Sequence, residues 1–111
     1  MSGQCHAEQG NQASGAGVIA AFNFAYYSLR NGQAARALAA PSTSVLPAPQ
    51  LQTYIDNLPA GTSYCQKITE ISAEVYLVAL TVTRPGQPAE TIAQTVSTQK
   101  LDGRWFVDVF A

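Results

Sequence analysis

The hydrophobic pattern changes its period once along this chain, near Leu58-Pro59-Ala60-Gly61. Before this point apolar residues recur every three to four positions, as on one face of a helix. After it they lie in runs rich in β-branched residues, or they alternate with polar residues, as in strands. A block of helices followed by a block of strands favours an α+β fold with an antiparallel sheet. The length of 111 residues fits one domain.

Two to three helices are expected in the first half. Ser14 can cap the first helix, because its hydroxyl can accept a hydrogen bond from the free N–H groups of the first turn. The apolar stripe of this helix consists of Val18, Ala21, Phe22, Ala25 and Leu29. Asn31-Gly32 supplies its C-terminal stop. A short second helix is expected at Gln33–Ala40, and a third begins at Pro49 and ends at Leu58.

Four strands are expected after Gly61, and the helices should lie across the sheet that they form. The strands are Ser63–Ile71, Glu74–Arg84, Thr91–Leu101 and Arg104–Phe110. Pro85-Gly86-Gln87-Pro88 and Asp102-Gly103 are turn sequences, so consecutive strands should pair in a four-stranded antiparallel meander. In the last strand, alternation places Trp105, Val107 and Val109 on one face. It places Phe106, Asp108 and Phe110 on the other.

Residues 1–13 are polar, small and without periodicity, so we expect a flexible leader or linker stub before a single domain at residues 14–111. Met1-Ser2-Gly3 is typical of an expression start placed on a truncated protein. We therefore expect the natural chain to continue upstream of residue 1.

Cys5 and Cys65 are the only two cysteines. We expect a disulfide between them, which would tie the leader to the sheet and stabilise the fold by roughly 4 kcal/mol in the chain-entropy model. The alternative is two unrelated thiols, one exposed and one buried. A disulfide and a surface rich in Gln, Ser and Thr favour an extracytoplasmic location, secreted or anchored at the cell envelope. The anchor or signal would be absent from this chain.

Charged residues make up 12% of the chain, and the net charge is −1. The six basic residues are scattered, so no basic stripe is available to attract nucleic acid or an anionic membrane. No apolar run approaches the roughly 20 residues of a spanning helix. We therefore expect no nucleic-acid partner and no direct membrane insertion by this segment.

The segments AAFNFAYYSLRNGQAARALAAP and LDGRWFVDVF, with LPAGTSYCQKITEIS between them, resemble the nuclear-transport-factor-two-like superfamily. More narrowly, GAGVIAAFNFAYYSLRNGQAAR and LPAGTSYC are similar to an uncharacterised group of actinobacterial envelope or secreted domains. The resemblance implies a SnoaL-like or cystatin-like cone, in which helices pack on a curved sheet. It also implies a homodimer through the sheet. It implies no activity, because the superfamily includes enzymes, binding proteins and assembly modules.

No residue is assigned a catalytic or metal-binding role, and no cofactor is expected. His6 is the only histidine and lies in the leader, and one His with two distant Cys cannot form an ordinary zinc site. Gly15-Ala16-Gly17 precedes a helix but follows no strand, so it is not a dinucleotide loop. Asp108 could face the cone, where burial would raise its pKa. The alternative is a position on the open face of the sheet, where Asp108 is solvated or paired with a basic residue.

Aromatic residues supply the other candidate site. Aromatic walls with a few polar groups suit a small apolar ligand. The aromatic residues that could line such a pocket are Phe22, Phe24, Tyr26, Tyr27, Tyr54, Tyr76, Trp105, Phe106 and Phe110. The candidate ligand-binding residues are Tyr26, Tyr27, Tyr54, Tyr76, Trp105 and Asp108. The alternative is that the aromatic residues fill the core between the helix and the sheet.

Three functions are consistent with these features. The first is a non-enzymatic accessory or interaction domain that faces the cell envelope, with an envelope protein as its partner. The second is the binding of a small apolar ligand in the cavity of the cone. The third is an enzyme of the isomerase or cyclase type that uses Asp108 or a tyrosine.

Overall fold

A computed structural model describes residues 5–111 and shows the expected order of helices and strands. The helical segments are α1 (Gly15–Asn23), η1 (Phe24–Ser28), α2 (Gly32–Arg36) and α3 (Ala48–Asp56). The strands are β1 (Ser63–Ser72), β2 (Val75–Thr83), β3 (Glu90–Leu101) and β4 (Arg104–Phe110). The strands pair antiparallel in the order β1-β2-β3-β4. The prediction of an α+β fold with a four-stranded meander is confirmed.

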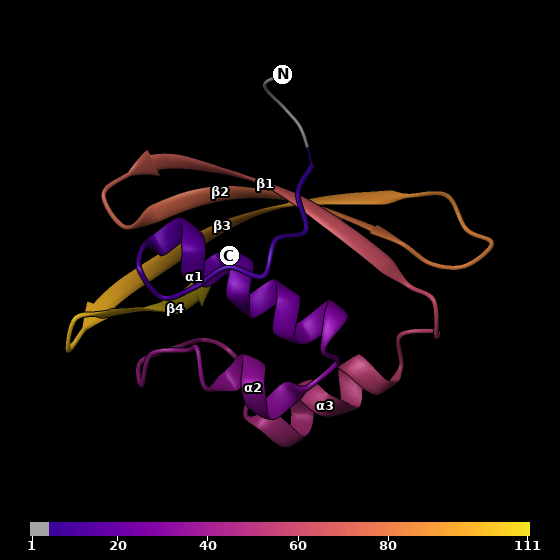
Figure 1. The fold of residues 1–111 in the computed structure, drawn as a ribbon, viewed down its shortest axis with the longest axis horizontal. Helices are drawn as coiled ribbons and strands as arrows, with labels where there is room; N and C mark the ends of the chain where they lie inside the picture. Colours follow the sequence, from indigo (N-terminus) through magenta and orange to yellow (C-terminus); the bar gives the residue numbers. More distant parts are fainter. Residues whose placement is uncertain (1–4) are drawn as a thin grey trace.

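The helices cover one face of the sheet, as Figure 1 shows. On β2 alternate side chains are buried against them, which explains why this strand is so apolar. The buried residues of β2 are Tyr76, Val78, Leu80 and Val82. They form one core with Val18, Ile19 and Phe22 of α1. The tip of the β2–β3 hairpin projects beyond the helices (Figure 1).

The first helix begins as expected but widens before its end. The Ser14 hydroxyl accepts a hydrogen bond from Gly17 N at 2.9 Å, which confirms the predicted cap. From Phe24 the segment is a π-helix, in which Leu29 N donates to Phe24 O at 3.0 Å. A wider turn rotates the following residues away from the expected stripe. For this reason Leu29 is 58% exposed, and its predicted place in the buried stripe is wrong.

The last strand contains a bulge that changes which residues face the helices. Val96 pairs with Phe110 and Thr98 pairs with Val107, so three residues of β4 span the distance of two in β3. The extra residue shifts the alternation by one position. Phe110 therefore lies on the same side as Val107, while Val109 is exposed. The predicted alternation, with Val109 beside Val107 and Phe110 opposite, is wrong beyond Asp108.

Residues 5–13 lie along the sheet and α1 instead of extending as a free leader. His6 and Gln66 exchange two backbone hydrogen bonds of 2.7 Å at the free edge of β1. The predicted disulfide between Cys5 and Cys65 is present, with Cα atoms 5.2 Å apart. Farther along, Gln12 bonds to the backbone of Trp105. The first four residues lie outside the part that the structure describes.

The opposite edge of the sheet is also covered. Ala40 N donates to Val107 O at 2.7 Å, and Val107 N donates to Leu38 O at 2.9 Å, so residues 38–40 run beside β4. Unpaired edge strands are prone to pair with other chains, and both edges here have partners. Within residues 5–111 no helix has the length and apolar character needed to cross a membrane.

Candidate functional site

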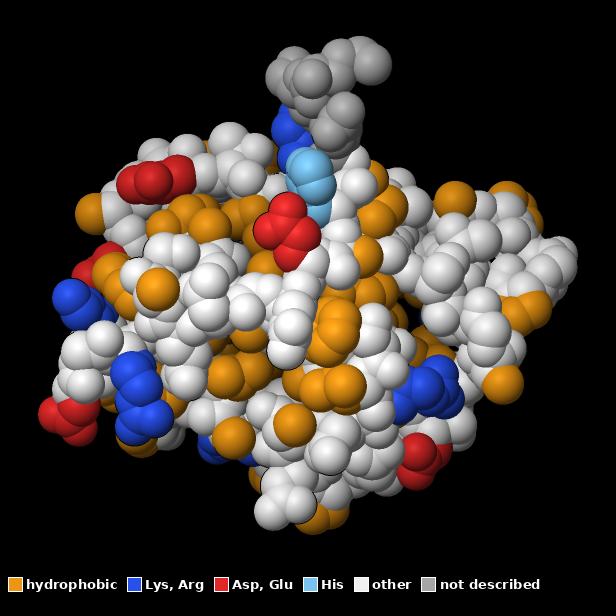
Figure 2. Space-filling model, in the orientation of Figure 1, with side chains coloured by type: hydrophobic (Ala, Val, Ile, Leu, Met, Phe, Trp, Pro, Cys, Tyr) orange, Lys and Arg blue, Asp and Glu red, His pale blue; other side chains and the backbone are white. Residues whose placement is uncertain are grey.

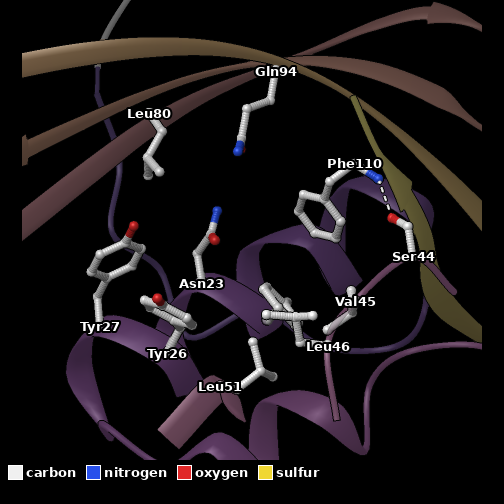
Figure 3. A pocket seen from close by; sticks show the side chains of 11 residues that line it. Asn23, Tyr26, Tyr27, Ser44, Val45, Leu46, Leu51, Leu80, Gln94 and Phe110 are labelled. Carbon is white, nitrogen blue, oxygen red and sulfur yellow. Dashed lines mark hydrogen bonds between the residues drawn. The ribbon is translucent and has the colours of Figure 1, made fainter. Parts of the chain in front are cut away.

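A pocket of about 330 Å³ opens between the helices and the inner face of the sheet (Figure 3). Its walls come from α1, η1, α3, the sheet and the loop before α3, segments that are far apart in the sequence. The lining residues are Phe22, Asn23, Tyr26, Tyr27, Ser44, Val45, Leu46, Leu51, Leu80, Gln94 and Phe110. The volume lies within the range of small-molecule sites.

Two irregular features of the backbone position the aromatic walls. The π-helical segment η1 carries Tyr26 and Tyr27, whose ring centroids lie 4.7 Å apart. The β4 bulge turns Phe110 inward, where its ring lies 5.2 Å from that of Phe22. π-helical turns and β-bulges are often found at functional sites, because they redirect a side chain without disrupting the fold.

The loop that carries Ser44, Val45 and Leu46 is fixed to β4 by several hydrogen bonds. Ser44 N donates to Asp108 O at 2.9 Å, and the Thr43 hydroxyl donates to the same oxygen at 2.6 Å. Phe110 N donates to the Ser44 hydroxyl at 3.0 Å (Figure 3). These bonds hold one wall of the pocket against the strand that supplies Phe110.

The polar groups of the pocket are uncharged. Asn23 is 4% exposed and donates one of its side-chain N–H groups to Oε1 of Gln66. The carbonyl oxygen of the Asn23 side chain takes no part in this hydrogen bond. Gln94 projects its amide into the pocket from β3, and it makes no hydrogen bond to the other lining residues (Figure 3). The hydroxyls of Tyr26 and Tyr27 come from the helical side (Figure 3).

The tyrosines of this region are protonated at neutral pH, and burial raises their pKa values further. It raises the pKa of Tyr27 to about 12, an effect that Tyr26 reinforces and Arg84 opposes. Burial, together with Tyr54, also raises the pKa of Tyr26. Tyr64 stacks on Tyr27 with ring centroids 5.1 Å apart, and burial raises its pKa as well. These hydroxyls are therefore hydrogen-bonding groups and not bases near pH 7.

No Asp, Glu, Lys, Arg or His side chain lines the pocket. Over residues 5–111 no group of three or more His, Cys, Asp or Glu is arranged to hold a metal ion. Figure 2 shows few charged side chains on the face seen there. The chemistry available in the pocket is apolar contact and neutral hydrogen bonding.

Of the six predicted ligand-binding residues, the structure places Tyr26 and Tyr27 in the pocket. Tyr54 is 58% exposed on α3, and Tyr76 is buried in the core beside Gly15 and Thr98. Trp105 lies against the leader and not in the pocket.

Asp108 is also outside the pocket, and its partners are neutral side chains and not a basic residue. Its carboxylate accepts from the Ser42 hydroxyl at 2.9 Å and from Gln99 Nε2 at 3.3 Å. The Asp108 carboxylate therefore supports the loop that forms one wall of the pocket, and it does not line the pocket.

Sequence reasoning missed Asn23 and Gln94, and it included Phe110 only among the aromatic residues that could line an apolar pocket. Asn23 carried a signal, because an amide inside the apolar stretch from Val18 to Tyr27 needs a partner when it is buried. Gln94 carried a weaker one, as a polar residue on the strand face that also holds Val96. The side of the sheet on which Phe110 lies could not be predicted, since the bulge that turns it inward depends on pairing with β3.

A family model described as "Domain of unknown function (DUF8176)" matches residues 4–110, so the chain belongs to this family. Comparison with curated proteins and with solved structures found no significant match.

Proposed function

We propose that this domain is a non-enzymatic binding protein that holds a small, largely apolar molecule in the pocket between η1 and the sheet. The observation that carries the proposal is the pocket itself, with aromatic and aliphatic walls and a few uncharged hydrogen-bonding groups. Sites for small molecules have this composition, since apolar burial supplies affinity and a few polar groups set the orientation.

Two features support binding over catalysis. The tyrosine hydroxyls stay protonated at neutral pH, and the carboxylate of Asp108 is bonded to Ser42 and Gln99 outside the pocket. An isomerase or cyclase needs a base of suitable pKa within reach of its substrate. The described lining residues offer none at neutral pH.

We further propose that the domain works outside the cytoplasm, secreted or anchored at the envelope. The disulfide between Cys5 and Cys65 supports an oxidising compartment, where such bonds persist. We also propose that the domain has the cone-like fold of the nuclear-transport-factor-two-like superfamily. In that fold the pocket would lie at the mouth of the cone.

Nuclear magnetic resonance of the ¹⁵N-labelled domain tests ligand binding directly. Toluene and cyclohexanol serve as neutral probes, and we expect saturable shifts at Asn23, Tyr26, Tyr27 and Phe110. Val45→Trp should fill the pocket and abolish these shifts, whereas Tyr54→Phe on the exposed face of α3 should leave them unchanged. Shifts that survive in Val45→Trp, or that spread evenly over the surface, would overturn the proposal.

A second candidate function is an interaction through the other face of the sheet. Within residues 5–111 no helix lies over this face (Figure 1), and Leu77 is 41% exposed there beside the cross-strand pair Ala79 and Ala93. We propose a second copy of the chain as the occupant. Sedimentation should show a dimer that Leu77→Glu dissociates and that Leu29→Glu on the helical side does not. A monomer at all concentrations would overturn this candidate.

A further inference from the structure

We infer that the pocket selects a neutral molecule with an apolar body and one polar end that both donates and accepts hydrogen bonds, for which a carboxamide is the simplest example. This inference rests on the proposed function, because it concerns the same pocket. The inference adds the chemistry of the ligand, and it identifies Gln94 as the residue that recognises the polar end of the ligand.

The absence of charge from the lining argues for a neutral ligand. Moving an ion from water into an apolar site costs free energy that only an opposite charge or many hydrogen bonds can offset. Arg84 influences Tyr27 but does not line the pocket, and it pairs with Glu90 at 3.6 Å. Neither a carboxylate nor an ammonium group would find a counter-ion within the walls.

The two amides argue for a ligand with both a donor and an acceptor. Asn23 donates one of its two side-chain N–H groups to Gln66, and its carbonyl oxygen is available as an acceptor. Gln94 keeps both a donor and an acceptor available, and both amides are directed into the space between η1 and the sheet (Figure 3). A carboxamide can donate to the Asn23 oxygen while it accepts from the Gln94 N–H. A ketone or an ether can make only the second of these bonds.

The rest of the wall sets the apolar body. Phe22 and Phe110 form one side, and Leu51, Leu80 and Val45 form the others. The two phenyl rings are tilted by 42° and pack against each other, with centroids 5.2 Å apart. The pocket volume of about 330 Å³ equals that of about eleven water molecules at about 30 Å³ each. One aromatic or alicyclic ring with a short polar group fits this space.

Five probes of similar size separate the relevant properties: benzamide, benzoate, benzylamine, acetophenone and toluene. Titrations followed by ¹⁵N and side-chain amide resonances should show benzamide binding at least about tenfold more tightly than the two charged probes. It should also bind more tightly than acetophenone, which lacks a donor. The Asn23 and Gln94 side-chain amide signals should shift more with benzamide than with toluene, which makes no hydrogen bond to them.

Gln94→Leu is the matched variant, since it removes the amide and keeps the size of the side chain. We expect it to remove the preference for benzamide over toluene. Gln99→Leu makes the same change on the same strand, at a residue that bonds to Asp108 outside the pocket, and should leave that preference intact.

The outcomes separate the inference from the proposed function. If none of the five probes binds, both fail. If toluene binds as tightly as benzamide, or if benzoate binds most tightly, the pocket still binds small molecules and the inference about the amide end is overturned. A preference for benzamide that Gln94→Leu leaves unchanged would also overturn the role of Gln94.

Discussion

Asn23 at the end of α1 donates a side-chain hydrogen bond to Gln66 in the middle of β1, and both residues are almost fully buried, at 4% and 2% exposed. Asn23 lines the pocket on one side of this pair, and Gln66 pairs with His6 of the leader on the other. The hydrogen bond therefore connects three parts of the molecule: the pocket wall, the sheet and the segment tied down by the disulfide. Buried amides of this kind stabilise only when they are paired.

The first prediction concerns this pair. Asn23→Leu should lower the free energy of unfolding by about 1–3 kcal/mol, because it leaves the Gln66 amide buried without its partner. Gln66→Leu should cost a similar amount for the converse reason. Urea denaturation monitored by circular dichroism measures both losses.

The double variant Asn23→Leu/Gln66→Leu provides the control. Removing both amides leaves no unpaired group, so the double variant should be more stable than the sum of the single losses predicts. Strict additivity would show that the two side chains do not interact in solution.

The second prediction concerns the disulfide between Cys5 and Cys65. Replacing both cysteines with serine should lower the free energy of unfolding by about 2–4 kcal/mol, since the bond closes a long loop in the unfolded chain. The amide of His6 should also lose protection from hydrogen exchange, because its bond to Gln66 is next to the disulfide. Exchange rates at His6 that stay unchanged would mean that the leader is held on β1 without the bond.

The order of elements could be predicted from the sequence because local chemistry determines it. The Ser14 cap, the change of period near Gly61 and the Asp102-Gly103 turn each act over a few residues. Both turn residues indeed have positive φ angles, 51° and 78°, as a tight hairpin of this type requires. The disulfide was predictable because no other cysteine was present.

The site could not be predicted to the same extent, because it depends on irregularities that arise from tertiary pairing. The widened turn at Phe24–Ser28 and the bulge in β4 decide which aromatic residues reach the pocket. A strictly periodic analysis therefore assigned Tyr54 and Asp108 to the site and placed Phe110 on the face opposite Val107. The partner of Asn23 lies 43 residues away, a distance that no local pattern encodes.

The third prediction tests whether the leader packs closely on α1. Gly10 has φ of 73°, and a Cβ atom there would lie 2.3 Å from Ala21 N and 2.5 Å from Gly17 O. Gly10→Ala should therefore combine left-handed strain with a clash against the helix backbone. We expect a loss of about 2–4 kcal/mol in thermal or urea unfolding.

Gly86→Ala is the matched control for Gly10. Gly86 has nearly the same φ, 74°, but an added Cβ would meet nothing within 4 Å. It should cost only the strain, about 1 kcal/mol. Equal losses in the two variants would contradict the close contact between the leader and α1.

The fourth prediction concerns alkaline pH. The Tyr27 hydroxyl ionises near pH 10 in an unfolded chain, whereas burial raises its pKa to about 12 in the folded protein. Between these values the unfolded chain has lost a proton that the folded protein still holds, so unfolding releases a proton and becomes easier as the pH rises. The stabilising contribution is complete below pH 10 and is lost as the pH rises toward 12.

The size of this effect can be isolated by Tyr27→Phe, which keeps the ring that stacks on Tyr64 and removes the titrating hydroxyl. After allowance for partial solvent screening, we expect the wild-type protein to lose about 1–2 kcal/mol more than this variant between pH 9 and pH 11.5. Some pH dependence should remain in the variant, because burial also raises the pKa values of Tyr26 and Tyr64. Rapid urea unfolding at each pH measures the difference before the disulfide exchanges. Parallel stability curves for the two proteins would show that the Tyr27 hydroxyl is not buried against the pocket in solution.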